Sequence, residues 1–199
     1  MSATNRGAER VESDLYPTPL AAFRPLLPLI KQLGVPVWEP ACGDGRLITY
    51  MRDEGGMQAF GDDLRNGYDF LKSEAHHDCI VTNPPFSIAL DFCRHALAHA
   101  NNVFMLLRLG FLASEDRRPF WQAHPPRALF ILCKRPGFIM SCKCPLKECK
   151  HAWTLPIESV RPRQCVKCGF HQVKISTSDS ADYAWVHWGS RITPGIHHL

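Results

Sequence analysis

Residues 78–86 read DCIVTNPPF, a short apolar run that ends in two consecutive prolines. The run at 78–82 predicts a buried strand, and proline, which cannot donate a hydrogen bond to a sheet, must end it. In an open α/β sheet, ligands bind at the carboxyl ends of such strands. Asn83, Pro84 and Phe86 place an amide, a free carbonyl and an aromatic ring there. These groups suit a planar amine such as an exposed nucleobase, although a turn that only stiffens the chain could use the same residues.

Further strands are predicted on both sides of this run. They are expected at 35–40, 57–61, 102–107 and 128–133, with helices near 46–52, at 87–99 with Ser87 as its cap, and around 114–123. Strands that alternate with helices predict an α/β fold with a mostly parallel sheet covered on both faces. The last predicted strand, 183–188, follows a long insert rather than a helix, so we expect it to run antiparallel. The insert should then project from the ligand-binding edge, near Asn83.

The length and composition of the chain limit the number of domains and the location that can be expected. The chain has 199 residues, of which 45% are hydrophobic and 21% are charged, as expected for one soluble domain with a real core. No apolar run approaches the roughly 18 residues that span a bilayer, and the polar N-terminus lacks a secretory signal pattern. We therefore expect a cytoplasmic protein with reduced thiols. The predicted organisation is a flexible arm at 1–14, a core at 15–136, a basic insert at 137–176, and the final strand with a tail at 177–199.

A second motif, EPACGDG at 39–45, lies at a predicted strand-to-helix junction. Gly43 and Gly45 would let the backbone approach a ligand closely. The third glycine of the dinucleotide fingerprint is missing, and no Gly-Lys-Ser/Thr follows, so neither a nicotinamide cofactor nor a phosphate loop is indicated. Glu39 and Asp44 would repel a pyrophosphate and suit a ligand with a cationic end.

Further acids follow the second predicted strand. Asp63, about 20 residues past the glycines, is placed to accept hydrogen bonds from ribose hydroxyls, and Asp62 is an alternative for that role. Asp69 and Phe70 offer a carboxylate and a ring for an adenine amine and face.

In this order the motifs resemble those of S-adenosylmethionine-dependent amino-methyltransferases. Within that family they are most similar to the motifs of the small phage-type adenine-N6 DNA methyltransferases. The matching segments are YPTP at 16–19, EPACGDG at 39–45, Asp63, DFL at 69–71 and NPPF at 83–86. The resemblance covers residues 16–135 and the strand at 183–188. It implies a Rossmann-like class I methyltransferase sheet, S-adenosyl-L-methionine as cofactor, and the host cytoplasm if the protein is phage-encoded.

The resemblance also implies roles for single residues. Tyr16 and Thr18 would close over the cofactor, while Glu39, Gly43 and Gly45 would line its methionine part. Asp63 would hold the ribose, and Asp69 and Phe70 the adenine. Asn83, Pro84, Pro85 and Phe86 would form the catalytic turn, which begins with Asn rather than the Asp of many relatives. The Asn-first form also occurs in the family.

The insert carries two cysteine pairs, Cys144-x₄-Cys149 and Cys165-x₂-Cys168. This spacing in a cytosolic protein predicts a tetrahedral structural zinc site, with Cys142 or His151 as alternatives for one ligand. Residues 139–174 contain seven Lys or Arg and two Asp or Glu, a net charge of +5 against +4 for the whole chain. A basic segment on a near-neutral body predicts a polyanionic partner, so we interpret the insert as a zinc-ribbon-like element that contacts DNA.

The leading hypothesis is a DNA adenine-N6 methyltransferase. A second hypothesis keeps the amine chemistry but changes the substrate to RNA or to a protein glutamine. A third hypothesis is a non-catalytic protein, in which a zinc-ribbon module attached to an inactive methyltransferase core binds nucleic acid. The intact NPPF turn and the predicted cofactor acids argue against this third hypothesis.

Overall fold

The computed structural model describes residues 17–138, 141–142, 173–174 and 181–199. Its strands are β1 (Val37–Glu39), β2 (Ala59–Gly61), β3 (His77–Thr82), β4 (Ala100–Arg108), β5 (Ala128–Ile131), β6 (Ser141–Cys142), β7 (Val173–Lys174), β8 (Tyr183–Trp188) and β9 (Gly195–His198). Its α-helices are α1 (Leu20–Phe23), α2 (Leu27–Gln32), α3 (Arg46–Asp53), α4 (Ala89–His99), α5 (Leu109–Leu112) and α6 (Arg118–Ala123).

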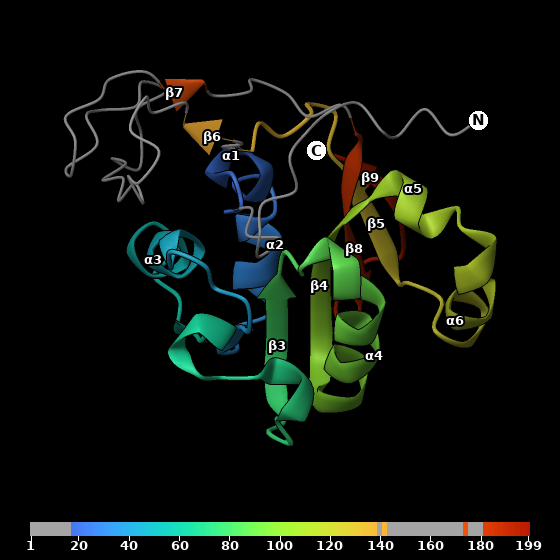
Figure 1. Ribbon diagram of the computed structural model, residues 1–199, viewed down its shortest axis with the longest axis horizontal. Helices are drawn as coiled ribbons and strands as arrows, with labels where there is room; N and C mark the ends of the chain where they lie inside the picture. The colour runs from blue at the N-terminus through green and yellow to red at the C-terminus, as the bar shows by residue number, and fades with distance from the viewer. Residues whose placement is uncertain (1–16, 139–140, 143–172, 175–180) are drawn as a thin grey trace.

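Seven strands form one sheet in the order β2-β1-β3-β4-β8-β5-β9 (Figure 1). β8 runs antiparallel to both of its neighbours, β4 and β5, and every other neighbouring pair is parallel. The predicted mostly parallel α/β sheet and the antiparallel strand at 183–188 are thus confirmed. β6 and β7 pair separately as a two-stranded ribbon between β5 and β8 in the chain.

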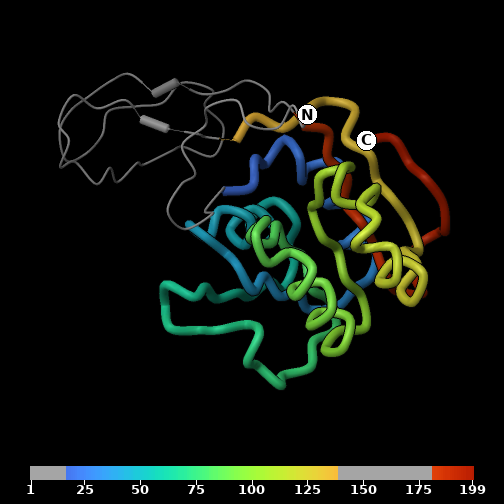
Figure 2. The backbone as a smooth tube through the Cα atoms, turned by 45° about the vertical axis from the view of Figure 1, so that its right-hand side comes forward, coloured from blue at the N-terminus to red at the C-terminus, as the bar shows by residue number. Residues whose placement is uncertain are grey.

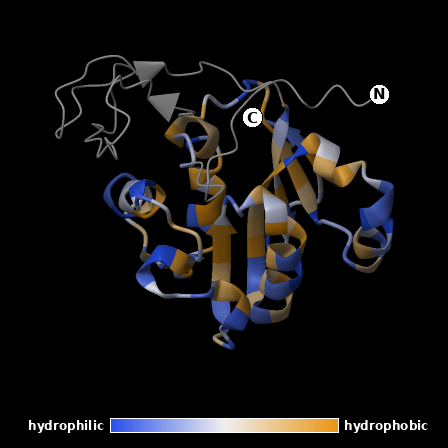
Figure 3. Cartoon of the chain, viewed as in Figure 1, coloured by the Kyte–Doolittle hydropathy of each residue, from blue (hydrophilic) through white to orange (hydrophobic). Residues whose placement is uncertain are grey.

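The central strands are buried on both faces, which explains their continuous apolar sequence. Along β4, Phe104 and Leu106 belong to one buried cluster, and Val103, Met105 and Leu107 belong to the other. Successive side chains of a strand point to opposite faces, so an unbroken apolar run is what a sheet covered on both sides needs. The hydropathy colouring shows these strands as apolar between helices that carry polar outer faces (Figure 3).

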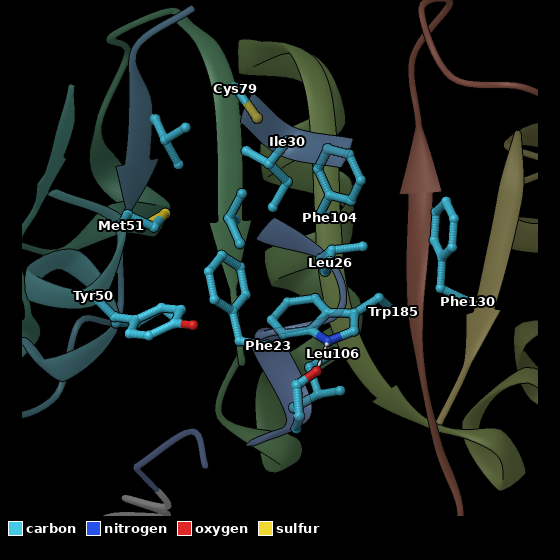
Figure 4. Packing of buried hydrophobic residues seen from close by; sticks show 14 of the residues in the cluster. Phe23, Leu26, Ile30, Tyr50, Met51, Cys79, Phe104, Leu106, Phe130 and Trp185 are labelled. Atoms are coloured by element: carbon cyan, nitrogen blue, oxygen red, sulfur yellow. Dashed lines mark hydrogen bonds between the residues drawn. The ribbon is translucent and has the colours of Figure 1, made fainter. Parts of the chain in front are cut away.

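Helices α1, α2 and α3 pack on one face of the sheet, and α4 and α6 pack on the other. On the first face, Phe23 meets Trp185 edge to face with ring centroids 5.8 Å apart. The indole Nε1 of Trp185 also donates to the carbonyl of Ala22 at 2.9 Å, so α1 is fixed to β8 by a hydrogen bond as well as by packing (Figure 4).

Several local expectations are corrected. The strand at 183–188 is not the last, because β9 adds a parallel edge strand beside β5. Ser87 does not cap the following helix, since it lies within the 3₁₀ turn η3 (Phe86–Ile88) and α4 starts at Ala89 without a side-chain cap. Helices α1 and α2 were not predicted, because prolines interrupt their short apolar segments. Among the described residues, no helix has the length and apolarity to cross a lipid bilayer.

Candidate active site

The predicted site residues converge at the carboxyl edge of the sheet. β1 ends at Glu39, β2 ends at Gly61 and β3 ends at Thr82, directly before Asn83. These three strands are parallel neighbours, so the loops that follow them emerge side by side, where open α/β sheets bind ligands.

A cavity of about 270 Å³ opens at this edge. Eight of the predicted site residues line it, namely Thr18, Glu39, Gly43, Asp63, Asp69, Phe70, Asn83 and Pro85. Gly45, Pro84 and Phe86 are not among its lining residues, and Tyr16 lies outside the described part of the chain. Asp62, the alternative ribose ligand, does not line the cavity either. The structure therefore brings the predicted cofactor acids and two residues of the NPPF turn, Asn83 and Pro85, together in one cavity.

The glycine loop, residues 40–45 between β1 and α3, has a backbone conformation that only glycine adopts easily at two of its positions. Gly43 and Gly45 have φ angles of 59° and 76°, in the left-handed region that costs other residues energy. Gly45 turns the chain into α3 as its N-cap. Gly43 donates its backbone N–H to Oδ2 of Asp63 at 2.9 Å, so the loop is tied to the end of the neighbouring strand.

Asp63 also accepts hydrogen bonds from Arg65. Its Oδ1 accepts from the Arg65 backbone at 3.1 Å and from Arg65 Nε at 2.7 Å, and the Arg65 guanidinium also donates to the carbonyl of Gly43. Burial acts to raise the pKa of Asp63, but the hydrogen bonds from Arg65 and Gly43 outweigh it and hold the pKa below its ordinary value. Oδ1 accepts two hydrogen bonds from Arg65, whereas Oδ2 accepts one from Gly43 and has a second lone pair. Asp63 can therefore fix the loop and still accept a ligand hydroxyl through Oδ2.

Arg65 was missed from the sequence although it lines the cavity. The signal that could have found it is its position two residues after Asp63, in the turn η1 (Leu64–Asn66) that Asp63 caps. A basic residue so placed can fold back onto the capping carboxylate.

We expect Asp63→Ala to weaken the binding of S-adenosylmethionine by roughly 10- to 100-fold, the usual range for lost hydrogen bonds to a charged group. Calorimetry with the purified protein measures the affinity directly. Asp62→Ala is the matched control, because it removes the adjacent carboxylate without touching the cavity lining. If Asp62→Ala weakened binding and Asp63→Ala did not, the ribose role would pass to Asp62.

Glu39 is the most buried acid of the site. Its residue is 2% exposed, and its Oε1 has no hydrogen-bond partner among the described residues. Burial raises the pKa of Glu39 to about 8, against smaller lowering effects of the Thr82 hydroxyl and the Ala41 backbone. The raised pKa favours the neutral carboxylic acid in the ligand-free protein, whereas a cation beside the side chain would favour the carboxylate.

Asp69 and Phe70 add an acid and an aromatic ring to the cavity lining. Asp69 caps the turn η2 (Phe70–Lys72) by accepting from the Leu71 backbone at 3.2 Å, and it pairs with Lys72 at 2.9 Å. Phe70 is buried, with its ring 5.0 Å from that of Phe92 on α4. These two residues therefore combine a fixed carboxylate with an apolar wall, which suits a flat ring that carries a polar group.

The NPPF turn faces two surroundings. Asn83 and Pro85 line the cavity, whereas the half-buried ring of Phe86 lies beside Phe138 and Tyr183, with centroids 6.5 Å and 6.1 Å away. β5 ends at Ile131, the described chain continues to Phe138, and it resumes at residue 181 before β8 (Figure 2). The ring centroids of Phe138 and Tyr183 are 5.3 Å apart. Phe138, near the start of the insert, and Tyr183, the first residue of β8, thus lie next to Phe86.

The predicted zinc ligands Cys144, Cys149, Cys165 and Cys168 lie outside the described residues, as do Tyr16 and the arm at 1–14. Within the described ranges, no three His, Cys, Asp or Glu side chains gather closely enough to hold a metal ion.

A search of protein-family models finds no match to this chain. A search of curated proteins finds none either. Among solved structures, a candidate RNA methyltransferase from Pyrococcus horikoshii is similar, with a TM-score of 0.50 and 14% sequence identity over 96% of this chain and 94% of that one. At this identity the likeness shows a shared fold.

Proposed function

We propose that this protein transfers the methyl group of S-adenosylmethionine to the exocyclic amine of adenine in DNA. The observation that carries the proposal is the shared cavity, in which Asn83 and Pro85 of the NPPF turn meet the acids Glu39, Asp63 and Asp69. The fold shared with a candidate methyltransferase supports methylation as the reaction class.

The residues present fit this cofactor. In the described part of the chain, no lysine lines the cavity, and the two arginines that do are paired, Arg46 with Asp44 at 2.8 Å and Arg65 with Asp63 at 2.7 Å. Such a lining disfavours phosphates. Glu39 is buried with an unpartnered oxygen, which suits the cationic amino acid end of the cofactor. Asp63 would then hold the ribose, and Asp69 with Phe70 the adenine.

The chain's own residues would act by alignment and charge. The cofactor supplies a methyl group already activated by its sulfonium, so the transfer itself needs no metal. The Asn83 side-chain oxygen and the Pro84 carbonyl accept hydrogen bonds from the target amine, favouring a pyramidal nitrogen and stabilising the positive charge that develops on it. Phe86 stacks on the base after it leaves the duplex, because the amine is unreachable inside the stack.

We propose that the insert holds one structural zinc through Cys144, Cys149, Cys165 and Cys168 and contacts the nucleic acid. Elemental analysis is expected to find about one equivalent of zinc, lost in the Cys165→Ser, Cys168→Ser double variant. Replacing Lys147, Arg161, Arg163 and Lys167 should weaken DNA binding and lower the slope of its salt dependence by roughly one per lost phosphate contact. Wild-type affinity and slope in that variant would mean that another surface holds the substrate.

RNA is the second candidate substrate, since the structurally similar protein is a candidate RNA methyltransferase. The deciding experiment offers tritiated S-adenosylmethionine and the full chain with unmethylated genomic DNA, total RNA or a protein extract, side by side. The labelled nucleosides are then separated by chromatography. Labelled N6-methyladenine from DNA alone supports the proposal, label in RNA or protein redirects it, and no transfer to any of the three refutes it.

A further inference from the structure

An arginine that the motifs do not include lies over the ring of Phe86. Arg108 is the last residue of β4, and β4 is the neighbour of β3, which carries the NPPF turn. Its guanidinium carbon is 4.6 Å from the centroid of the Phe86 ring. A cation at this distance from a ring face is attracted by the ring's negative face.

The guanidinium is itself held in place. Arg108 and Tyr183 are direct partners across the antiparallel pair β4–β8, and Arg108 Nε donates to the Tyr183 hydroxyl at 3.0 Å. Tyr183 is fully buried. Buried Tyr183 therefore holds the Arg108 guanidinium, which in turn lies over the ring of Phe86, the last residue of the NPPF turn.

We infer that Arg108 is a positioning residue that holds the Phe86 ring in the orientation in which it stacks on the target base. This inference rests on the proposed function. Arginine suits the task because its planar guanidinium stacks on an aromatic face while Nε keeps a separate hydrogen bond. Lysine would preserve the charge but could supply neither the plane nor the fixed bond. Small displacements of the reacting groups lower the reaction rate by large factors. Loss of the Arg108 contact should therefore slow the methyl-transfer step itself.

The chain contains a matched arginine for comparison. Arg24 donates from Nε to the Tyr50 hydroxyl at 3.2 Å, and its guanidinium carbon lies 6.0 Å from the Tyr50 ring centroid. Neither residue lines the cavity. Arg24→Lys therefore removes the same kind of contact away from the NPPF turn.

The test measures kcat and KM for unmethylated genomic DNA at saturating S-adenosylmethionine, and cofactor affinity by calorimetry. Arg108→Lys is expected to lower kcat about tenfold or more with unchanged cofactor affinity. Tyr183→Phe, which removes only the hydroxyl that holds Nε, should lower kcat in the same direction by a smaller factor. Arg24→Lys should match the wild type in kcat.

Other results would overturn the inference. A rise in KM with unchanged kcat would make Arg108 a substrate contact. A lower melting temperature with unchanged kcat, equal in Arg108→Lys and Arg24→Lys, would make it a structural clip. If Arg108→Lys failed to fold, unchanged kcat in Tyr183→Phe would still refute the inference. A wild-type protein inactive on DNA and RNA refutes the proposed function and this inference together, whereas an active wild type with an unaffected Arg108→Lys variant refutes this inference alone.

Discussion

Asn83→Ala is expected to lower methyl transfer by on the order of 10² to 10³, while cofactor affinity stays close to that of the wild type. Loss of one preorganised group that stabilises developing charge costs about that factor. Asn83 follows β3 and lines the cavity, but its proposed contact is with the substrate amine rather than with the cofactor body. Single-turnover transfer of tritiated methyl groups measures the rate, and calorimetry measures the affinity.

Asn101→Ala is the matched control for Asn83→Ala. Asn101 is exposed near the amino end of β4, at the opposite edge of the sheet, so removing its amide should leave transfer unchanged. Near-normal turnover in Asn83→Ala would exclude the proposed mechanism. A large loss of cofactor affinity would instead move Asn83 into the cofactor site.

The second large effect concerns Glu39 and pH. Burial raises the pKa of Glu39 from 4.5 to about 8. Between these two pH values, the Glu39 carboxyl therefore keeps its proton in the folded, cofactor-free protein and loses it in the unfolded chain. Glu39 alone should therefore lower the free energy of unfolding by about 1.4 kcal/mol per pH unit as pH rises from 4.5 to 8. Buried His187, whose pKa is lowered from 6.5 to about 4 by burial, has the opposite effect below pH 6.5. The net fall is therefore expected between pH 6.5 and pH 8. Chemical denaturation at several pH values measures this slope.

Cofactor binding should show the opposite trend. A cation beside Glu39 favours the carboxylate, so binding releases the proton and strengthens as pH rises. We expect up to a tenfold gain in affinity between about pH 6 and pH 7, where the cofactor's own amine stays protonated. Calorimetry in buffers of different ionisation enthalpy counts the released protons.

Glu39→Gln separates these effects from other titrations, because a neutral amide replaces the acid in nearly the same shape. The variant should lose the fall in unfolding free energy between about pH 6.5 and pH 8 and the gain in affinity between about pH 6 and pH 7, and it should bind S-adenosylmethionine more weakly at neutral pH. Glu54→Gln, at the exposed C-cap of α3, should keep both slopes. Equal pH dependence of the wild type and Glu39→Gln would show that Glu39 titrates normally and does not face the cationic end of the cofactor.

Much of the fold and of the site follows from local sequence. The apolar run before Asn83 and the two prolines define where β3 ends, since proline removes the donors that a longer strand needs. The alternation of strands and helices places the ends of β1, β2 and β3 at one edge, and so predicts that Glu39, Asp63 and Asn83 meet. The insert before β8, in place of a helix, predicts the antiparallel direction of that strand.

Tertiary structure alone decided the remaining features. β9 is a four-residue strand that forms by pairing with β5, and its own sequence has too weak an apolar pattern to predict it. Asp63 fixes Gly43 from 20 residues away, and Arg108 reaches Tyr183 from 75 residues away. Turn chemistry and apolar periodicity act between near neighbours and can be read along the chain. Contacts such as these depend on which strands pair and in what register, and that is settled only when both faces of the sheet are buried together.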